Sequence, residues 1–159
     1  MKKNLSSEEA LHRAAALCST AEKCRSEIAG KLAQWGLSSS ESTSLLGQLE
    51  EKGYIDEARY CRSFVNDKIK FDRWGRLKIA AALRQKKISE DSIQVALAQI
   101  DEGDYRTLLQ ELLHRKRQSL GGEDNPEIRA KLMRFAVSRG FEGREIVSQI
   151  GGKEERYEE

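Results

Sequence analysis

The chain has 159 residues and a mass of 18.0 kDa, which suffices for one ordinary domain or a few small units and excludes a large multidomain enzyme. Charged residues make up 34%, the hydrophobic set 38%, and the mean hydropathy is -0.66, so the chain is polar without having a fully disordered composition. A run of roughly 18 apolar residues and an apolar signal core are both absent, so we expect a cytoplasmic protein with no membrane partner.

Charge is distributed unevenly along the chain. Residues 1–58 carry 7 Lys and Arg against 9 Asp and Glu, residues 59–87 carry 10 against 2, and residues 88–159 carry 11 against 15. The net charges of the three parts are therefore -2, +8 and -4. A basic middle between mildly acidic ends predicts a polyanionic partner for the central part.

Cysteine and histidine are too few for a metal site or a disulfide framework. The three cysteines are Cys18, Cys24 and Cys61, and no two of them form a C-x-x-C pair. His12 and His114 are the only imidazoles. We therefore expect no metal and no cofactor, and three cysteines that act as small apolar residues.

An amphipathic helix that ends at a turn and is followed by an apolar residue occurs three times, in residues 27–37, 77–88 and 128–141. The turn positions are Gly36, Lys87 and Gly140, which are 51 and 53 residues apart. A repeat of this period indicates one supersecondary unit used three times.

A further helix is predicted before and after each of these three, which gives nine helices and no strands. The preceding helices span residues 8–17, 57–71 and 105–118. The predicted fold is all-α, with three tandem three-helix repeats that form an elongated, curved helical array. The predicted boundaries are residues 1–55, 56–102 (the basic repeat) and 103–152, followed by a disordered tail, residues 153–159.

Local signals place several helix ends. Ser19 and Glu22 have the spacing of a capping box, which predicts that the second helix starts there. Gly36 and Gly140 can adopt the left-handed conformation that ends a helix without a Cβ penalty. Lys87 stands at the equivalent position of the middle repeat, so its turn must be closed differently or carry mild strain.

The central helix predicted over residues 57–71 presents Arg59, Arg62, Asn66 and Lys70 on one face. Such a row of cations can neutralise phosphates or meet an acidic protein surface, while the simpler alternative is a solvated face. Trp74 and Phe71 lie beside the cations and could stack on bases or anchor an interface, or they could be core. The candidate binding surface is Arg59, Arg62, Lys70, Arg73, Trp74, Arg76, Lys78, Arg84, Lys86 and Lys87.

A second basic cluster, residues 114–117, precedes a loop of the third repeat that spans residues 121–126 and begins with two glycines. Four more cations in that repeat could extend the binding surface: Arg129, Lys131, Arg134 and Arg139. Acidic residues nearby reduce the net positive charge here, which weakens the prediction of a binding surface in this repeat. Tyr54 and Trp35 are interpreted as packing residues, Tyr54 across the turn between the first two repeats.

Two segments carry a resemblance to a known family. Residues 53–65 read GYIDEARYCRSFV, and residues 73–89 read RWGRLKIAAALRQKKIS. Together with Phe135, Gly140 and Phe141, they resemble the RecX family of bacterial regulators of the RecA recombinase. The resemblance runs from about residue 9 to residue 150. The chain departs from the family pattern at Lys87, where glycine is usual, and at Trp74, where a basic residue is more common.

The resemblance implies a non-enzymatic modulator that binds the RecA nucleoprotein filament, lodges in its groove and restrains its ATPase, strand-exchange and repressor-cleavage activities in recombination and the SOS response. Its implied partners are the RecA filament and single-stranded DNA, or duplex DNA, within or beside it. The residues alone also allow a stand-alone DNA-binding protein, because three-helix units resemble helix-turn-helix modules. Tight, sequence-selective binding to bare oligonucleotide distinguishes that alternative.

Catalysis has no support in the sequence. A Walker glycine loop, a G-x-S-x-G motif and an H-E-x-x-H motif are all absent, so we expect no enzyme, and an enzyme with a dispersed site is the third hypothesis. A heptad seam is absent too, so we expect a monomer. Reversing Arg62, Arg73 and Arg76 to glutamate is expected to abolish inhibition while leaving the helical content intact.

Overall fold

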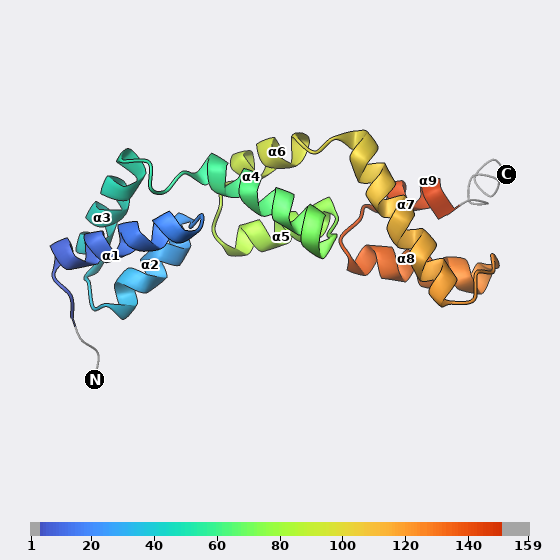
Figure 1. Ribbon diagram of the computed structural model, residues 1–159, viewed down its shortest axis with the longest axis horizontal. Helices are drawn as coiled ribbons and strands as arrows, with labels where there is room; N and C mark the ends of the chain where they lie inside the picture. The colour runs from blue at the N-terminus through green and yellow to red at the C-terminus, as the bar shows by residue number, and fades with distance from the viewer. Residues whose placement is uncertain (1–3, 151–159) are drawn as a thin grey trace. The chain divides into compact units, whose positions relative to one another are not determined.

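The computed structural model describes residues 4–150, and this part of the chain forms nine α-helices, one π-helix and no strand (Figure 1). The α-helices are α1 (Ser7–Thr20), α2 (Arg25–Gln34), α3 (Ser39–Glu51), α4 (Glu57–Asp67), α5 (Arg76–Gln85), α6 (Glu90–Ala98), α7 (Glu102–Ser119), α8 (Pro126–Ser138) and α9 (Gly143–Ile150), with the π-helix η1 (Lys68–Asp72) after α4. The all-α, repeated architecture predicted from the sequence is confirmed. The predicted tail, residues 153–159, lies outside the described residues.

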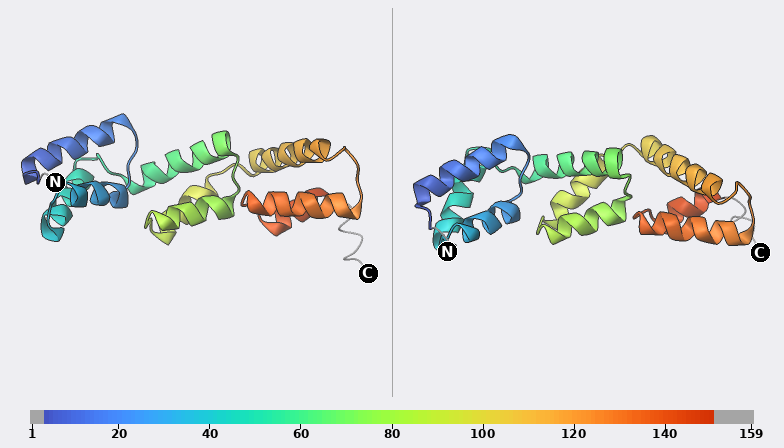
Figure 2. Two further views of the ribbon diagram at one scale, coloured as in Figure 1. Left: turned by 90° about the horizontal axis from the view of Figure 1, so that it is seen from below. Right: turned by 60° about the horizontal axis from the view of Figure 1, so that its bottom comes forward.

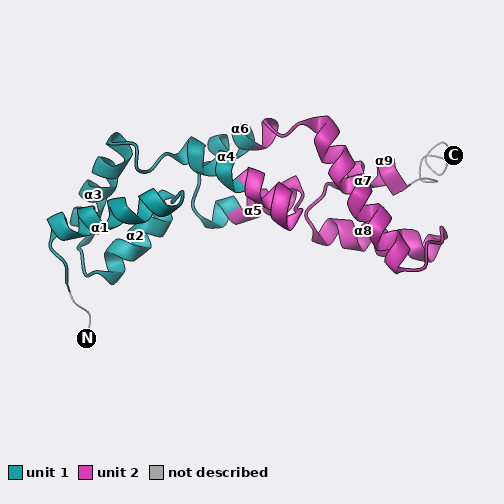
Figure 3. Ribbon diagram, in the orientation of Figure 1, with its two compact units in different colours: residues 1–64, 83–96 teal, residues 65–82, 97–159 magenta. Residues whose placement is uncertain are grey.

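The chain divides into two compact units (Figure 3). Unit 1 comprises residues 1–64 and 83–96, and unit 2 comprises residues 65–82 and 97–159. Helices α4, α5 and α6 each cross a boundary, so the middle repeat contributes to both units. Helices α1–α3 of unit 1 and α7–α9 of unit 2 each pack as a three-helix bundle in every view (Figure 2).

The core of unit 1 lies between α1, α2 and α3. Its fully buried members include Ala14, Ile28, Leu32 and Leu49, one or two from each helix. The small alanines of α1 let the other two helices approach closely, while each buried Leu or Ile stabilises the fold by about 1.5–3 kcal/mol. A short helix cannot bury its apolar stripe alone, so three helices share one core.

The core of unit 2 is built around two aromatic residues. Tyr105 of α7 and Phe141, which follows α8, are both 1% exposed, and their ring centroids lie 5.3 Å apart. Leu109, Leu132 and Ile146 complete the cluster from α7, α8 and α9. The Tyr105 hydroxyl remains available for hydrogen bonds at the edge of this core, which is the usual way a buried tyrosine is accommodated.

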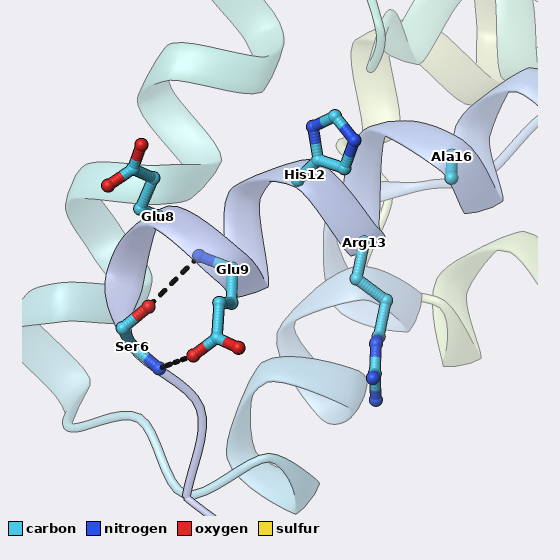
Figure 4. Close-up of a pocket in the computed structure, with 6 residues that line it drawn as sticks. All are labelled: Ser6, Glu8, Glu9, His12, Arg13 and Ala16. Atoms are coloured by element: carbon cyan, nitrogen blue, oxygen red, sulfur yellow. Dashed lines mark hydrogen bonds between the residues drawn. The ribbon is translucent and has the colours of Figure 1, made fainter.

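Helix α1 begins with a capping box made by Ser6 and Glu9 (Figure 4). The Glu9 N–H donates to Ser6 Oγ over 3.1 Å, and the Ser6 N–H donates to the Glu9 carboxylate over 3.1 Å. The shallow hollow beside this cap is lined by six residues of α1 and its N-cap alone: Ser6, Glu8, Glu9, His12, Arg13 and Ala16. The two hydrogen bonds in this hollow are those of the capping box, so the hollow gives no indication of a binding function.

The predicted start of the second helix is wrong. Ser19 lies inside α1, where its hydroxyl donates to the Ala15 carbonyl over 3.0 Å. Helix α2 starts after Cys24, whose N–H donates to the Glu27 carboxylate over 3.0 Å. Ser19 and Cys24 are each followed three residues later by a glutamate, so either could begin a helix with a capping box. The helix begins after Cys24 because this start places Cys24 and Ile28 in the core.

The three repeat turns share one backbone conformation. The φ angles of Gly36 and Gly140 are +86° and +96°, as predicted. Lys87 adopts the same left-handed region with φ +63°, which is uncommon for a residue with a Cβ. Each turn is closed by the same hydrogen bond, in which the residue after the turn donates to a helix carbonyl: Leu37 to Leu32, Ile88 to Leu83 and Phe141 to Ala136.

Candidate partner-binding surface

The basic segment between α4 and α5 departs from a regular helix. The predicted α-helix over residues 57–71 ends at Asp67, and η1 continues it with the wider π-turn. Arg73 then adopts a left-handed conformation with φ +57°, and the Trp74 N–H donates to the Lys68 carbonyl over 3.1 Å. The wider turn interrupts the helical face on which Lys70 was predicted to lie. Strained backbone and π-turns of this kind gather at functional sites.

Two ammonium groups share the ring of Trp74. Lys68 Nζ lies 4.6 Å from the ring centroid and Lys78 Nζ lies 4.7 Å from it. Trp74 is half-buried, whereas Phe71 is 71% exposed, with Lys70 Nζ 5.4 Å from its ring. The core interpretation is therefore wrong for Phe71, and Trp74 serves to hold cations.

Arg76 is engaged by carboxylates of its own unit. Its side chain is 16% exposed, and its guanidinium forms ion pairs with Glu142 at 2.9 Å and Glu102 at 2.6 Å and lies 3.9 Å from the Tyr105 ring centroid. Burial works to raise the pKa of Glu142, but hydrogen bonds from Tyr105 and Arg76 bring that pKa below its ordinary value. Burial also raises the pKa of Tyr105. Arg76 thus stabilises unit 2, and its reversal to glutamate would disturb the fold.

Arg59 is held by its own unit. Its Nε donates to the Glu22 carboxylate over 2.7 Å, and its guanidinium donates to the carbonyls of Gly53 and Tyr54 over 2.9 and 3.3 Å. The hydrogen bond to Glu22 raises the pKa of Arg59. Tyr54 itself is 38% exposed, and its packing across the turn stays a prediction.

Three further cations of the predicted surface have carboxylate partners. Arg73 lies 3.7 Å from Glu111. The exposed Arg84 makes two hydrogen bonds to Glu90, of 2.9 and 2.6 Å. Lys86 donates to Glu27 over 2.8 Å. Together with Arg59 and Arg76, half of the predicted set is therefore engaged within the chain.

Four predicted cations have no carboxylate partner among the described residues: Arg62, Lys70, Lys78 and Lys87. Arg62, Lys70 and Lys87 are exposed, and Lys78 is half-buried against Trp74. Arg62 and Lys87 belong to unit 1, whereas Lys70 and Lys78 belong to unit 2 with Trp74. The cations of the predicted surface that have no carboxylate partner thus fall into two pairs, and in unit 2 Lys78 lies over Trp74 while Lys70 lies over Phe71.

A second arrangement of the same kind lies in the third repeat. Lys116 Nζ and the Arg139 guanidinium each lie 5.2 Å from the Phe135 ring centroid. Arg139 also donates to the Asp72 carbonyl over 3.2 Å, which joins this arrangement to the end of η1. Lys116 of the second basic cluster and Arg139 were both among the cations that could extend the binding surface, whereas Phe135 was identified only as part of the family resemblance and not as a ring that holds cations.

Other kinds of site find no support within residues 4–150. That part of the chain contains no group of three or more potential metal ligands and no helix long and apolar enough to cross a membrane. Cys18, Cys24 and Cys61 are all unpaired, and burial raises the pKa of the Cys61 thiol to about 11, which makes it a poor nucleophile.

Comparison with known proteins identifies the repeats. Residues 56–97 match the second three-helix domain of RecX, and residues 104–148 match its third three-helix domain. The chain is 35% identical to a regulatory protein RecX of Herminiimonas arsenicoxydans over 146 residues, which are 90% of this chain and 91% of that protein.

Two solved structures share the fold. A crystal structure of regulatory protein RecX matches with a TM-score of 0.82 and 24% identity, over 91% of this chain and 70% of the other. The crystal structure of RecX from Lactobacillus salivarius matches with a TM-score of 0.84 and 16% identity, over 93% and 96% of the two chains. Matches to two repeat domains of RecX, and 35% identity to a RecX protein of which the chain covers 91%, show that the chain belongs to the RecX family of regulatory proteins.

Proposed function

We propose that this protein binds the RecA filament on single-stranded DNA in the cytoplasm and inhibits its ATPase, strand-exchange and coprotease activities. Membership of a family of regulatory proteins supports a regulatory role. The observation that carries the proposal is the pair of lysines beside exposed or half-buried aromatic rings, because Lys78 over Trp74 and Lys70 over Phe71 are left without a carboxylate partner among the described residues, in a segment of net charge +8. Cations that the fold does not neutralise are available to an anionic partner.

The test is the ATPase rate of the cognate RecA on single-stranded DNA, titrated with this protein at two salt concentrations. Inhibition at low stoichiometry that survives added salt supports a filament regulator with substantial protein contacts. An unchanged ATPase rate, together with tight binding to bare oligonucleotide, contradicts the proposal and favours the stand-alone DNA-binding alternative.

A double variant locates the surface. Lys70→Glu with Lys78→Glu is expected to raise the concentration needed for half-inhibition by about tenfold, since two charge reversals at an interface cost about 1.4 kcal/mol. The matched control is Lys52→Glu with Arg144→Glu, which makes the same change in net charge at two exposed cations outside the surface. Equal losses in both variants would show that only the total charge matters.

A further inference from the structure

Three of the large exposed apolar side chains lie in unit 2 on segments that touch one another. Phe71 in η1, Leu77 in the first turn of α5 and Val137 near the end of α8 are 71%, 57% and 54% exposed. The Leu77 N–H donates to the Gly140 carbonyl over 2.9 Å, so the start of α5 contacts the end of α8. The end of α8 also contacts η1, through the Arg139 guanidinium and the Asp72 carbonyl. Exposed apolar side chains on adjoining segments of one unit are candidates for an interaction site.

Cations accompany these apolar residues. Lys70 lies in η1 next to Phe71, Lys78 follows Leu77 in α5, and Arg134 lies one turn before Val137 in α8. None of the three forms an ion pair with a carboxylate of residues 4–150. We define the apolar–cationic surface as these six residues: Phe71, Leu77, Val137, Lys70, Lys78 and Arg134.

The aromatic rings nearby are already used to hold cations. Lys68 and Lys78 share the ring of Trp74, and Lys116 and Arg139 share the ring of Phe135. Proteins hold single-stranded nucleic acid with a basic groove for the backbone and with aromatic faces on which the bases stack. A base that stacked on the face of Trp74 or Phe135 where a cation lies would displace an ammonium or guanidinium group, at the loss of a cation–π contact. This arrangement disfavours bases as the ligand.

Acidic protein fits the surface better. Leu77 and Val137 are aliphatic, so they gain nothing from stacking but are stabilised when an apolar side chain covers them. Cations held over an aromatic ring have already lost part of their rotamer freedom, so pairing with a carboxylate costs them less entropy. We infer that the apolar–cationic surface docks an acidic protein segment that carries at least one apolar side chain, presented by the filament protein and not by its DNA. This inference rests on the proposed function.

Site-specific photo-crosslinking in the full chain tests the inference. A benzophenone amino acid is placed at position 77, and the protein is irradiated on RecA filaments assembled on dye-labelled single-stranded DNA. The ATPase rate of the same sample, with the unsubstituted chain alongside, reports whether filament regulation occurs at all. If the unsubstituted chain does not inhibit, the proposed function fails, and the identity of the adduct is not needed to see this.

The expected adduct joins this chain to RecA and survives nuclease. An adduct that carries the DNA dye overturns the inference, and so does the lack of any adduct while the ATPase is inhibited. The matched control places the same benzophenone at position 95, because Val95 is 59% exposed but belongs to unit 1. Equal crosslinking from position 95 would also overturn the inference, since it would show no preference for the surface.

A pair of small substitutions gives a second readout. Leu77→Ser with Val137→Ser changes two side chains that are more than half exposed, so folding should persist, and Val95→Ser is the control. The double variant is expected to need about tenfold more protein for half-inhibition while its affinity for a bare single-stranded oligonucleotide stays unchanged. Undiminished inhibition, or an equal loss of oligonucleotide affinity, contradicts an acidic and apolar protein partner.

Discussion

The two ends of α5 are held in different ways. In unit 1 the chain just after α5 is tied to the start of α2 by side chains: Ser26 Oγ donates to the Lys86 carbonyl over 2.6 Å, and Lys86 Nζ donates to Glu27 over 2.8 Å. The Tyr60 hydroxyl lies 3.5 Å from the same Glu27 carboxylate. Burial works to raise the pKa of Glu27, but the hydrogen bonds from Lys86 and from the Cys24 N–H bring it below its ordinary value.

In unit 2 the start of α5 is tied to the end of α8 by backbone. The Gly75 N–H donates to the Arg139 carbonyl over 2.7 Å, and the Leu77 N–H donates to the Gly140 carbonyl over 2.9 Å. A Cβ added at Gly75 would lie 2.5 Å from the Gly140 backbone. The Arg76 guanidinium, clamped between two carboxylates, closes the same junction.

The comparison shows what each junction requires of the sequence. The α5–α8 junction needs glycine on both sides, because two backbones approach too closely for a Cβ, and its hydrogen bonds respond little to salt. The α2–α5 junction depends on one partly exposed ion pair and on one serine hydrogen bond. Other side chains could form equivalent contacts at these positions, and added salt weakens the ion pair. The apolar–cationic surface lies beside the backbone-held junction, which is where a rigid support is most useful.

The largest effect is expected from adding a methyl group to a glycine of the α5–α8 junction. Gly140→Ala places a Cβ 2.3 Å from Lys78 Cβ and 2.6 Å from Lys78 N, at a residue whose φ is +96°. Overpacking and left-handed strain together should lower the free energy of unfolding by about 3 kcal/mol or more. Urea unfolding followed by circular dichroism measures this.

Gly30→Ala is the matched control for this junction. Gly30 lies inside α2, and a Cβ there would meet no atom within 4 Å. The substitution should stabilise the protein by about 0.5–1 kcal/mol, because alanine favours the helix. If Gly140→Ala were tolerated as well as Gly30→Ala, the two backbones would not approach as closely as described.

A smaller effect, dependent on pH, is expected at the ion pair that closes the α5–α8 junction. The pKa of Glu142 is lower in the folded protein than in the unfolded chain, so its contribution is present above the unfolded pKa and is lost as the pH falls through the folded one. Glu142→Gln should therefore cost about 1–2 kcal/mol near pH 7 and almost nothing near pH 2. Urea unfolding of both proteins at each pH checks this prediction. A difference in the free energy of unfolding that stayed constant with pH would contradict it.

Most of the fold could be predicted from the sequence because it depends on local patterns. The 3.6-residue periodicity identifies the helices, and the turns at Gly36, Lys87 and Gly140 set the repeat. The start of α2 was misplaced because the Ser19 and Cys24 positions both have a glutamate three residues on, and only packing distinguishes them. The π-helix could not be predicted, because its end is held by a contact with Arg139, far along the chain.

Less of the candidate site could be predicted, because the pairing of charges depends on distant residues. Arg59 meets Glu22, 37 residues away, and Arg76 meets Glu142, 66 residues away. Counting charges along the chain cannot reveal such partners, so every cation of the basic segment looked available. The segment was identified correctly as basic, but which of its cations remain unpaired is a property of the fold.

The smallest effect is expected at the α2–α5 junction. Lys86→Met removes the ion pair with Glu27 but leaves the Lys86 carbonyl to accept from Ser26, so half of the junction persists. Because the Lys86 side chain is 39% exposed, solvent screening limits the loss to about 0.5 kcal/mol at low salt. The loss should disappear near 1 M NaCl, where the Debye length is about 3 Å. Lys52→Met, at an exposed lysine with no carboxylate partner among the described residues, controls for the change in net charge. A loss at Lys86 that persisted in high salt would mean that this junction, like the one at Gly140, depends on packing more than on charge.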